Sequence, residues 1–180
     1  MGDELEELKE NAEKAERDPS LKPVSLTMAI LAVFVAAVSL LGHRAHTEEL
    51  LLQNKATDNW SYYQAKNIRR HTYDLFLDML SISDPKDSQA AGQIKEKYTN
   101  EIKRYDQDLK EIEAEARRLE EETAQAGKKG DRFDLGEVFL EVALVVTSIC
   151  LLTGRKHFWA VGSLVGVAGL GVAVTALWMH

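Results

Sequence analysis

The chain has 180 residues, a formal net charge of −7 and 28 % charged residues, but its charges are unevenly distributed. No charged residue lies between Val24 and Leu41 or between Phe158 and Met179, and each run is long enough to cross a bilayer as a helix. This pattern argues against a soluble single-domain enzyme. The acidic balance, with no dominant basic cluster, argues against a nucleic-acid partner.

Residues 1–22 form an acidic tail, in which the apolar spacing predicts either a short helix ending at Asp18-Pro19 or a frayed polar segment. A secretory signal would need a basic start and a small-residue cleavage site. The apolar run that follows is therefore predicted to be an uncleaved membrane anchor.

The first membrane span is predicted over residues 23–42. Small residues recur in it at intervals of three and four, and such a face allows another helix to approach closely. These residues are Ser25, Ala29, Ala32, Ala36 and Ser39.

The polar residues 43–132 are predicted to form an antiparallel coiled-coil hairpin with arms 43–82 and 89–126, joined by a turn at 83–88. The arms match in length, so the hairpin would project about 55–60 Å and return to the membrane. Residues 127–130, with a glycine at each end, are predicted to be a hinge before the second span.

Each arm carries a line of residues spaced alternately by three and four, which is typical of a coiled-coil seam. In the second arm the line is Tyr98, Ile102, Tyr105, Leu109, Ile112, Ala116, Leu119, Thr123 and Ala126. In the first arm it is Ala65, Ile68, Thr72, Leu75, Met79 and Ile82. Apolar residues off these lines, such as Leu50 and Phe76, are predicted to meet other copies or a partner protein.

The second and third spans are predicted over residues 133–153 and 158–179. Gly162, Gly166 and Gly169 give the third span a small-residue face, for which the small residues of the first span are the predicted partner. The complete prediction is an all-α fold with three transmembrane helices and a long hairpin between the first two.

Polar residues at the hairpin ends of the first two spans are the candidate functional site: His43, Arg44, His46, Asp134, Glu137 and Glu141. In a structural interpretation Asp134 caps a helix, Glu137 completes a capping box, and Glu141 pairs with Arg44 or a histidine. In a functional interpretation the carboxylates line an oligomeric path for cations or protons.

No catalytic motif, cofactor motif or complete metal site is recognised in the sequence. His43 and His46 could share a helix face, but no third ligand follows at a diagnostic spacing. Cys150 is the only cysteine, and it is predicted to be a buried apolar residue.

The basic link at Arg155-Lys156 favours a cytoplasmic N-terminus and link, with the hairpin in the periplasm. Arg44, Lys128, Lys129 and Arg132 flank the spans on the other side and favour the reverse orientation.

The whole pattern resembles bacterial domain-of-unknown-function family 4337. The resemblance depends on several segments, on a charged helix and on the spans around them. The segments are Leu41-Gly42-His43-Arg44-Ala45-His46-Thr47-Glu48, then Trp60, Tyr62-Tyr63-Gln64-Ala65-Lys66 and Ile68-Arg69-Arg70-His71, and finally Asp131-Arg132-Phe133-Asp134-Leu135-Gly136-Glu137. It implies a bacterial membrane protein and brings no catalytic residue or cofactor.

These observations predict a non-enzymatic protein of the bacterial inner membrane, whose partners are the lipid bilayer and either further copies or other subunits of a membrane complex. It would act as a scaffold or accessory subunit, assembling through the hairpin and the small-residue faces. The alternative is an oligomeric ion-conducting or transport-related protein that uses Glu137 and Glu141.

Overall fold

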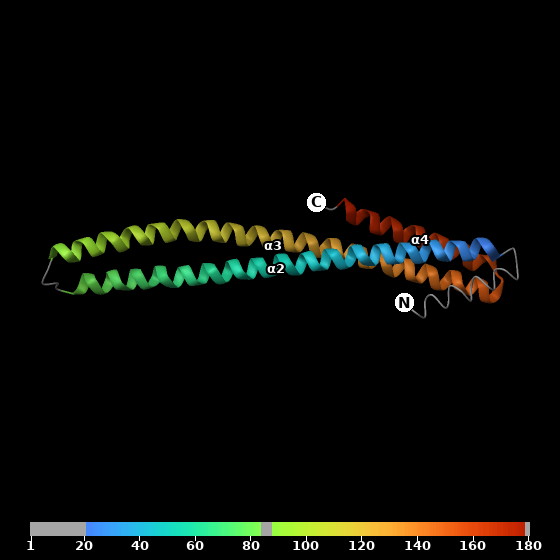
Figure 1. The fold of residues 1–180 in the computed structure, drawn as a ribbon, viewed down its shortest axis with the longest axis horizontal. Coiled ribbons are helices and arrows are strands. Elements are labelled where there is room, and N and C mark those ends of the chain that lie inside the picture. The colour runs from blue at the N-terminus through green and yellow to red at the C-terminus, as the bar shows by residue number, and fades with distance from the viewer. Residues whose placement is uncertain (1–20, 84–87, 179–180) are drawn as a thin grey trace. The chain divides into compact units, whose positions relative to one another are not determined.

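The computed structural model describes residues 21–83 and 88–178, and all regular structure within them is helical. The helices are α2 (Lys22–Ile82), α3 (Ser88–Thr153) and α4 (Lys156–Leu177) (Figure 1). The predicted all-α class is confirmed. The predictions for the tail before residue 21 and for residues 84–87 of the hairpin turn fall outside the described residues.

Each of the three helices contains a segment long and apolar enough to cross a membrane. In α2 this segment lies near the start of the helix, and in α3 near its end, because most charged residues of both helices lie in the remaining parts. α4 has the length and the composition of a membrane span throughout. A multi-pass membrane protein is consistent with this composition.

Neither long helix is interrupted. α2 passes through Gly42, so the first predicted span continues directly into the first arm. α3 passes through residues 127–130, and the predicted hinge there is wrong. Glycine costs about 1 kcal/mol in a helix interior. Gly130 is nevertheless buried, between buried Ala126 and Phe133 on the same face, and this packing offsets the cost.

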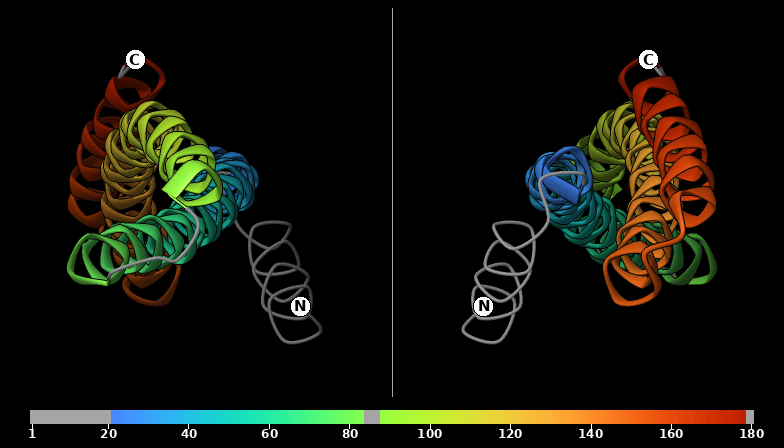
Figure 2. Two further views of the ribbon diagram at one scale, coloured as in Figure 1. Left: turned by 90° about the vertical axis from the view of Figure 1, so that its left-hand side faces the viewer. Right: turned by 90° about the vertical axis from the view of Figure 1, so that its right-hand side faces the viewer.

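The chain divides into two compact units. The apolar unit comprises Met1–Glu48 and Gln125–His180, and the hairpin unit comprises Glu49–Ala124. In the apolar unit, the start of α2 and all of α4 pack against the last part of α3 (Figures 1 and 2). Its largest core cluster includes Leu31 and Val38 of α2, Phe133 and Leu140 of α3, and Ala173 of α4.

The face of α2 that packs in the apolar unit differs from the predicted one. Ala29 and Ala36 are exposed and Ala32 is half-buried, so this small-residue face contacts neither α3 nor α4 closely. Bulkier residues occupy the contact because they fill the space against Phe133 and Leu140. The buried residues of α2 are Val24, Met28, Leu31, Val38, Gly42 and Ala45.

The glycine face of α4 is buried, but it packs mainly against α3. A Cβ atom on Gly162 would overlap Thr147 Oγ1, and one on Gly169 would lie 3.0 Å from the carbonyl oxygen of Gly136. Gly166 also meets Leu31 of α2, where a Cβ would lie 2.7 Å from Cδ2. The expected pairing of the α4 glycines with the small residues of the first span is therefore wrong.

The turn between α3 and α4 consists of Gly154 and Arg155. Gly154 has a φ of +68°, and its N–H donates to the carbonyl of Cys150 at 2.8 Å. A glycine adopts this left-handed conformation without strain, and it closes the end of α3. The short link therefore forms a tight turn between the two helices.

In the hairpin unit α2 and α3 run antiparallel, because residue numbers in their contacts rise on one helix as they fall on the other. Trp60 donates to Glu120, Lys66 to Asp108 and Arg70 to Asp106. All nine residues of the line predicted in the second arm are buried or half-buried. The most enclosed is Ala116, which is 0 % exposed.

The line predicted in the first arm faces the wrong way. Ala65, Ile68, Thr72, Leu75, Met79 and Ile82 are all exposed. The side of α2 that faces α3 instead carries polar and aromatic residues, which gain ion pairs and ring contacts across the hairpin. Its buried or half-buried members include Ala56, Asn59, Tyr63, Lys66, Arg70, Tyr73, Leu77 and Leu80.

Candidate functional site: a polar cluster between α2 and α3

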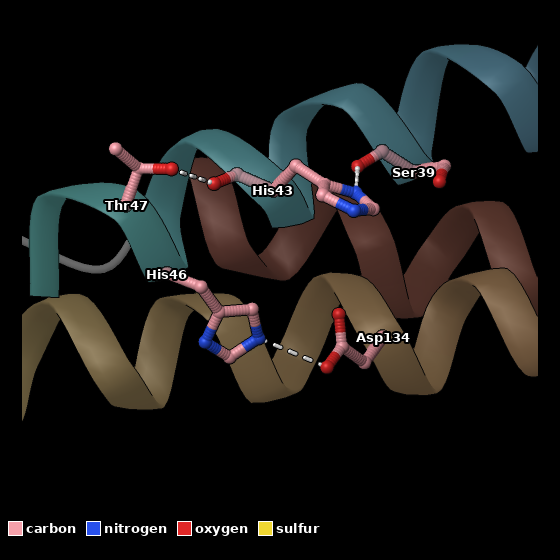
Figure 3. A network of polar contacts seen from close by, with 5 residues as sticks. All are labelled: Ser39, His43, His46, Thr47 and Asp134. Atoms are coloured by element: carbon pink, nitrogen blue, oxygen red, sulfur yellow. Dashed lines mark hydrogen bonds and ion pairs between the residues drawn. The ribbon is translucent and has the colours of Figure 1, made fainter. Parts of the chain in front are cut away.

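The candidate site lies within the apolar unit, where the part of α2 after its apolar segment packs against the part of α3 at the start of its own. His43, Arg44 and His46 come from α2, and Asp134, Glu137 and Glu141 come from α3. The structure joins one pair of them directly. The Nε2 atom of His46 lies 3.0 Å from Oδ2 of Asp134 (Figure 3).

Two glycines frame this pair. A Cβ atom on Gly130 would lie 2.6 Å from Cε1 of His46, so the imidazole lies against bare α3 backbone. A Cβ on Gly42 would lie 2.9 Å from Oδ1 of Asp134. One glycine on each helix thus makes room for the partner's side chain. These close contacts position the pair, although the side chains of His46 and Asp134 are 39 % and 54 % exposed.

The two histidines do not converge. His43 turns back along its own helix, with Nδ1 3.0 Å from the carbonyl oxygen of Ser39, whereas His46 points across to α3 (Figure 3). Thr47 donates to the carbonyl of His43 at 2.8 Å and occupies the next turn of the same helix. In the part of the chain that the structure describes, no three histidine, cysteine or acidic side chains are grouped as metal ligands.

The structural role predicted for Asp134 and Glu137 is wrong. α3 begins at Ser88, so neither residue lies near a helix N-terminus and neither caps one. Asp134 instead holds a residue on another helix. The misassignment followed from the predicted hinge, because a break at residues 127–130 would have started a new helix there.

The two glutamates differ from Asp134. Glu137 is half-buried and Glu141 is exposed, and the predicted pairing of Glu141 with Arg44 or a histidine is not formed. Among the described residues, neither glutamate has an ion-pair or hydrogen-bond partner. Glu141 lies within the apolar segment of α3, where an ionised carboxylate is costly unless it meets water or a partner.

The sequence interpretation missed Gly42 and Gly130 as parts of the site, because it placed Gly42 at the end of the first span and Gly130 in a hinge. The available signal was their spacing. Gly42 continues the intervals of three and four set by Val24, Met28, Leu31, Val35 and Val38, and Gly130 continues those of the second-arm line. A glycine that lies on the buried face of a helix can mark a close contact with another helix, and it does not have to mark a break in its own helix.

The hairpin unit has its own charged contacts, between α2 and α3. Nζ of Lys66 donates to Oδ2 of Asp108 at 2.6 Å, and this hydrogen bond is the main reason that the pKa of Lys66 is raised. Arg70 bridges Asp106 on α3 and Asp74 on its own helix, and its pKa is also raised, chiefly by the hydrogen bond to Asp106. These contacts fix the register of the two arms.

The fold and the cluster together define a class: an all-helical protein whose three described helices have the composition of a multi-pass membrane protein, with a charged hairpin unit between its first two apolar segments. A family model described as a domain of unknown function, DUF4337, matches residues 20–179. The chain therefore belongs to that family, as its sequence motifs predicted. A search of curated proteins and a search of solved structures each gave no match.

Proposed function

We propose that this protein is a non-enzymatic scaffold or accessory subunit of the bacterial inner membrane, which assembles with further copies or with other subunits. The observation that carries the proposal is the exposure of large apolar residues in the charged part of α2. Leu50 and Leu51 are 60 % and 58 % exposed, and Ile68 and Leu75 are 66 % and 63 % exposed. Apolar side chains at such positions are typical of a protein interface.

The contacts within the polar cluster also support the proposal. His46 and Asp134 bind each other and hold α2 against α3, and His43 binds its own helix. In this proposal the cluster is a structural contact that holds the two helices together at the membrane surface. The three apolar segments anchor the protein in the bilayer, with the N-terminus in the cytoplasm and the hairpin in the periplasm.

The test is the native mass and subunit composition of the complex after gentle extraction from its own membrane. A species at an integer multiple of the 20.2 kDa chain supports self-assembly. Fixed amounts of other polypeptides support an accessory role. A monomer without companions contradicts the proposal.

One observation favours a second candidate, an oligomeric ion-conducting or transport-related protein. Glu141 is exposed in an apolar segment without a partner among the described residues, and Glu137 lies one helical turn before it. Copies arranged around an axis would place these carboxylates along a water-filled path for cations or protons.

Glu141→Gln tests this alternative in proteoliposomes. If the glutamate lines a path, the variant loses ion flux while its native mass is unchanged. Asp131→Asn, a charge-neutralising change at an exposed α3 residue before the apolar segment, is the matched control and should retain the flux. Assembly that collapses in Glu141→Gln would show a structural role instead.

A further inference from the structure

Glu141 is an exposed carboxylate in the apolar segment of α3, and it has no ion-pair or hydrogen-bond partner among the described residues. It lies about a third of the way along residues 135–152, where the only other charged residue is Glu137. An ionised carboxylate in such a segment is costly unless it meets water or pairs with a cation. The ionised form of Glu141 therefore needs water or a cation that the described residues do not supply.

The chain carries no such cation on its own apolar segments. No lysine, arginine or histidine occurs in residues 24–41, 135–152 and 158–178. The nearest basic residue of α3 is Arg132, which lies about 13–14 Å before Glu141 along the helix and about half a turn round it. A second copy of the protein has the same apolar segments, so it would add a carboxylate and no cation. The charge therefore favours a different polypeptide as the partner of Glu141.

The side of α3 that carries Glu141 borders α2 and faces away from α4. Asp134 lies seven residues before Glu141, on the same side of the helix, and it binds His46 of α2. In Figure 3, α4 lies behind α2 and α3, whereas the contact between His46 and Asp134 lies in front of them. α4 packs against a different side of α3, where Thr147 meets Gly162. No described residue therefore covers this side of the two helices at Glu141.

Small residues of α2 lie beside Glu141. Gly42 meets Asp134, and the same antiparallel register brings Glu141 level with Ala36. Positions at intervals of seven before His46 stay on the side of α2 where it binds Asp134. The small residues on this side, all exposed or half-buried, are Ala32, Ala36 and Ser39. Such side chains allow the backbone of another helix to approach closely. We call these three residues and Glu141 the Glu141 surface.

We infer that the Glu141 surface binds a transmembrane helix of a different protein, which carries one lysine or arginine in its apolar segment to pair with Glu141. The inference rests on the proposed function and specifies the partner of an accessory subunit. Opposite charges attract strongly in a medium of low dielectric constant, where each charge alone is costly. The small residues of α2 let the partner helix lie close enough for this pairing. In the ion-path alternative, by contrast, Glu141 faces water.

Binding to two synthetic helices tests the inference. Both have about 20 apolar residues, and one carries a single lysine about a third of the way along, where the other has leucine. The full chain carries a donor dye at Arg155→Cys in a Cys150→Ala background, because Cys150 is the only natural cysteine. Energy transfer to an acceptor dye on the peptide measures association in phosphatidylcholine vesicles. We expect the lysine helix to bind several-fold more tightly than the leucine helix, and Glu141→Gln to remove this preference.

A charge reversal covers the case in which Glu141→Gln alters the fold. Glu141→Lys should bind a helix with a single glutamate several-fold more tightly than the lysine helix. A chain with native Glu141 that binds the lysine and leucine helices equally would overturn the inference.

Two neighbouring alanines of α2 test whether the partner uses the Glu141 surface. Ala36 and Ala37 are both exposed, but Ala37 precedes His46 by nine residues and so lies on the opposite side of the helix. Ala36→Leu should weaken binding of the lysine helix several-fold, because the larger side chain keeps the partner away from Glu141. Ala37→Leu is the matched control and should leave binding unchanged. Equal effects of the two changes would contradict the proposed surface.

The outcomes separate this inference from the proposed function. If the native complex contains other subunits or further copies but the lysine helix is not preferred, the proposed function stands and only the inference fails. If the lysine helix is preferred but the protein extracted from its own membrane is a monomer without companions, the surface stands and the proposed function fails. Preference for the lysine helix together with companion polypeptides supports both.

Discussion

Lys66 shows how a single charged residue stabilises the hairpin. Its hydrogen bond to Asp108 raises the pKa of Lys66 above the ordinary value of 10.5. A folded-state pKa above the unfolded one means that the ionised lysine stabilises the folded state fully at pH values below the unfolded pKa. That contribution is lost as the pH rises through the folded-state pKa. The pH dependence of stability that Lys66 causes is therefore expected at alkaline pH.

We therefore expect Lys66→Gln to lower the free energy of unfolding by a constant amount from neutral pH to about pH 9, with the difference from wild type shrinking at higher pH. Denaturant unfolding of the full chain in detergent at a series of pH values, followed by circular dichroism, measures this difference. Lys66→Arg is the control, because arginine stays protonated and should retain the stabilisation above pH 10.5. A wild-type-to-glutamine difference that grows with pH would contradict the assignment.

Gly162 tests the contact between α4 and α3. A Cβ atom there would overlap Thr147 Oγ1 and lie 2.9 Å from the carbonyl oxygen of Ala143, which belongs to the helix backbone and cannot rotate away. Gly162→Ala should destabilise the protein by about 1–3 kcal/mol, as overpacking does. Heating in detergent with a thiol-reactive dye should show this as earlier exposure of buried Cys150.

Gly171→Ala is the matched control on the same helix, since a Cβ there has nothing within 4 Å. It should unfold no earlier than wild type, because alanine favours the helix more than glycine does. Equal effects of the two changes would mean that the close approach at Gly162 does not stabilise the fold.

At the scale of elements, the second arm of the hairpin was predictable and the first was not. In the second arm the apolar spacing and the inward face coincide, and every predicted residue is buried or half-buried. In the first arm the apolar residues of the predicted line lie outside, and the inside carries Tyr63, Lys66, Arg70 and Tyr73 along with a few other apolar residues. Periodicity locates a face for packing on some helix, but it does not say which helix.

The inward face of the first arm can be inferred from the continuity of α2. The buried positions of α2 in the apolar unit, such as Val38, Gly42 and Ala45, continue at intervals of three and four through Glu49 into Leu52, Ala56, Asn59 and Tyr63. The predicted hinge would have interrupted α3, which is in fact continuous. That predicted break led to the capping role predicted for Asp134. The pair of His46 with Asp134 needs both helices unbroken and in register, and no local motif encodes that.

Ala116 tests the inward face of α3. It is 0 % exposed, whereas Ala114 of the same helix is exposed. Ala116→Leu should lower the free energy of unfolding by about 1–3 kcal/mol, because the larger side chain must displace α2. Ala114→Leu should change it little. Thermal melts of both variants by circular dichroism make the comparison, and a harmless Ala116→Leu would refute the observed orientation of α3.

At the scale of the whole molecule, the open property is its orientation in the membrane. In our proposal three spans place residues 21 and 178 on opposite sides of the membrane, and they place the hairpin opposite the turn at Gly154 and Arg155. The charges compete: Arg155 and Lys156 favour a cytoplasmic turn, whereas Arg44, Lys128, Lys129 and Arg132 lie on the hairpin side. Our proposed orientation follows the short basic turn, because basic residues in short loops orient membrane helices most strongly.

Two single-cysteine variants in a Cys150→Ala background test that orientation. Lys103→Cys marks an exposed hairpin position and Arg155→Cys marks the exposed turn. With a membrane-impermeant maleimide added to intact bacterial spheroplasts, we expect Lys103→Cys to be labelled at once and Arg155→Cys only after lysis. The reverse pattern would place the hairpin in the cytoplasm while keeping three spans. Labelling of both before lysis would put the turn and the hairpin on the same side and contradict the three-span arrangement itself.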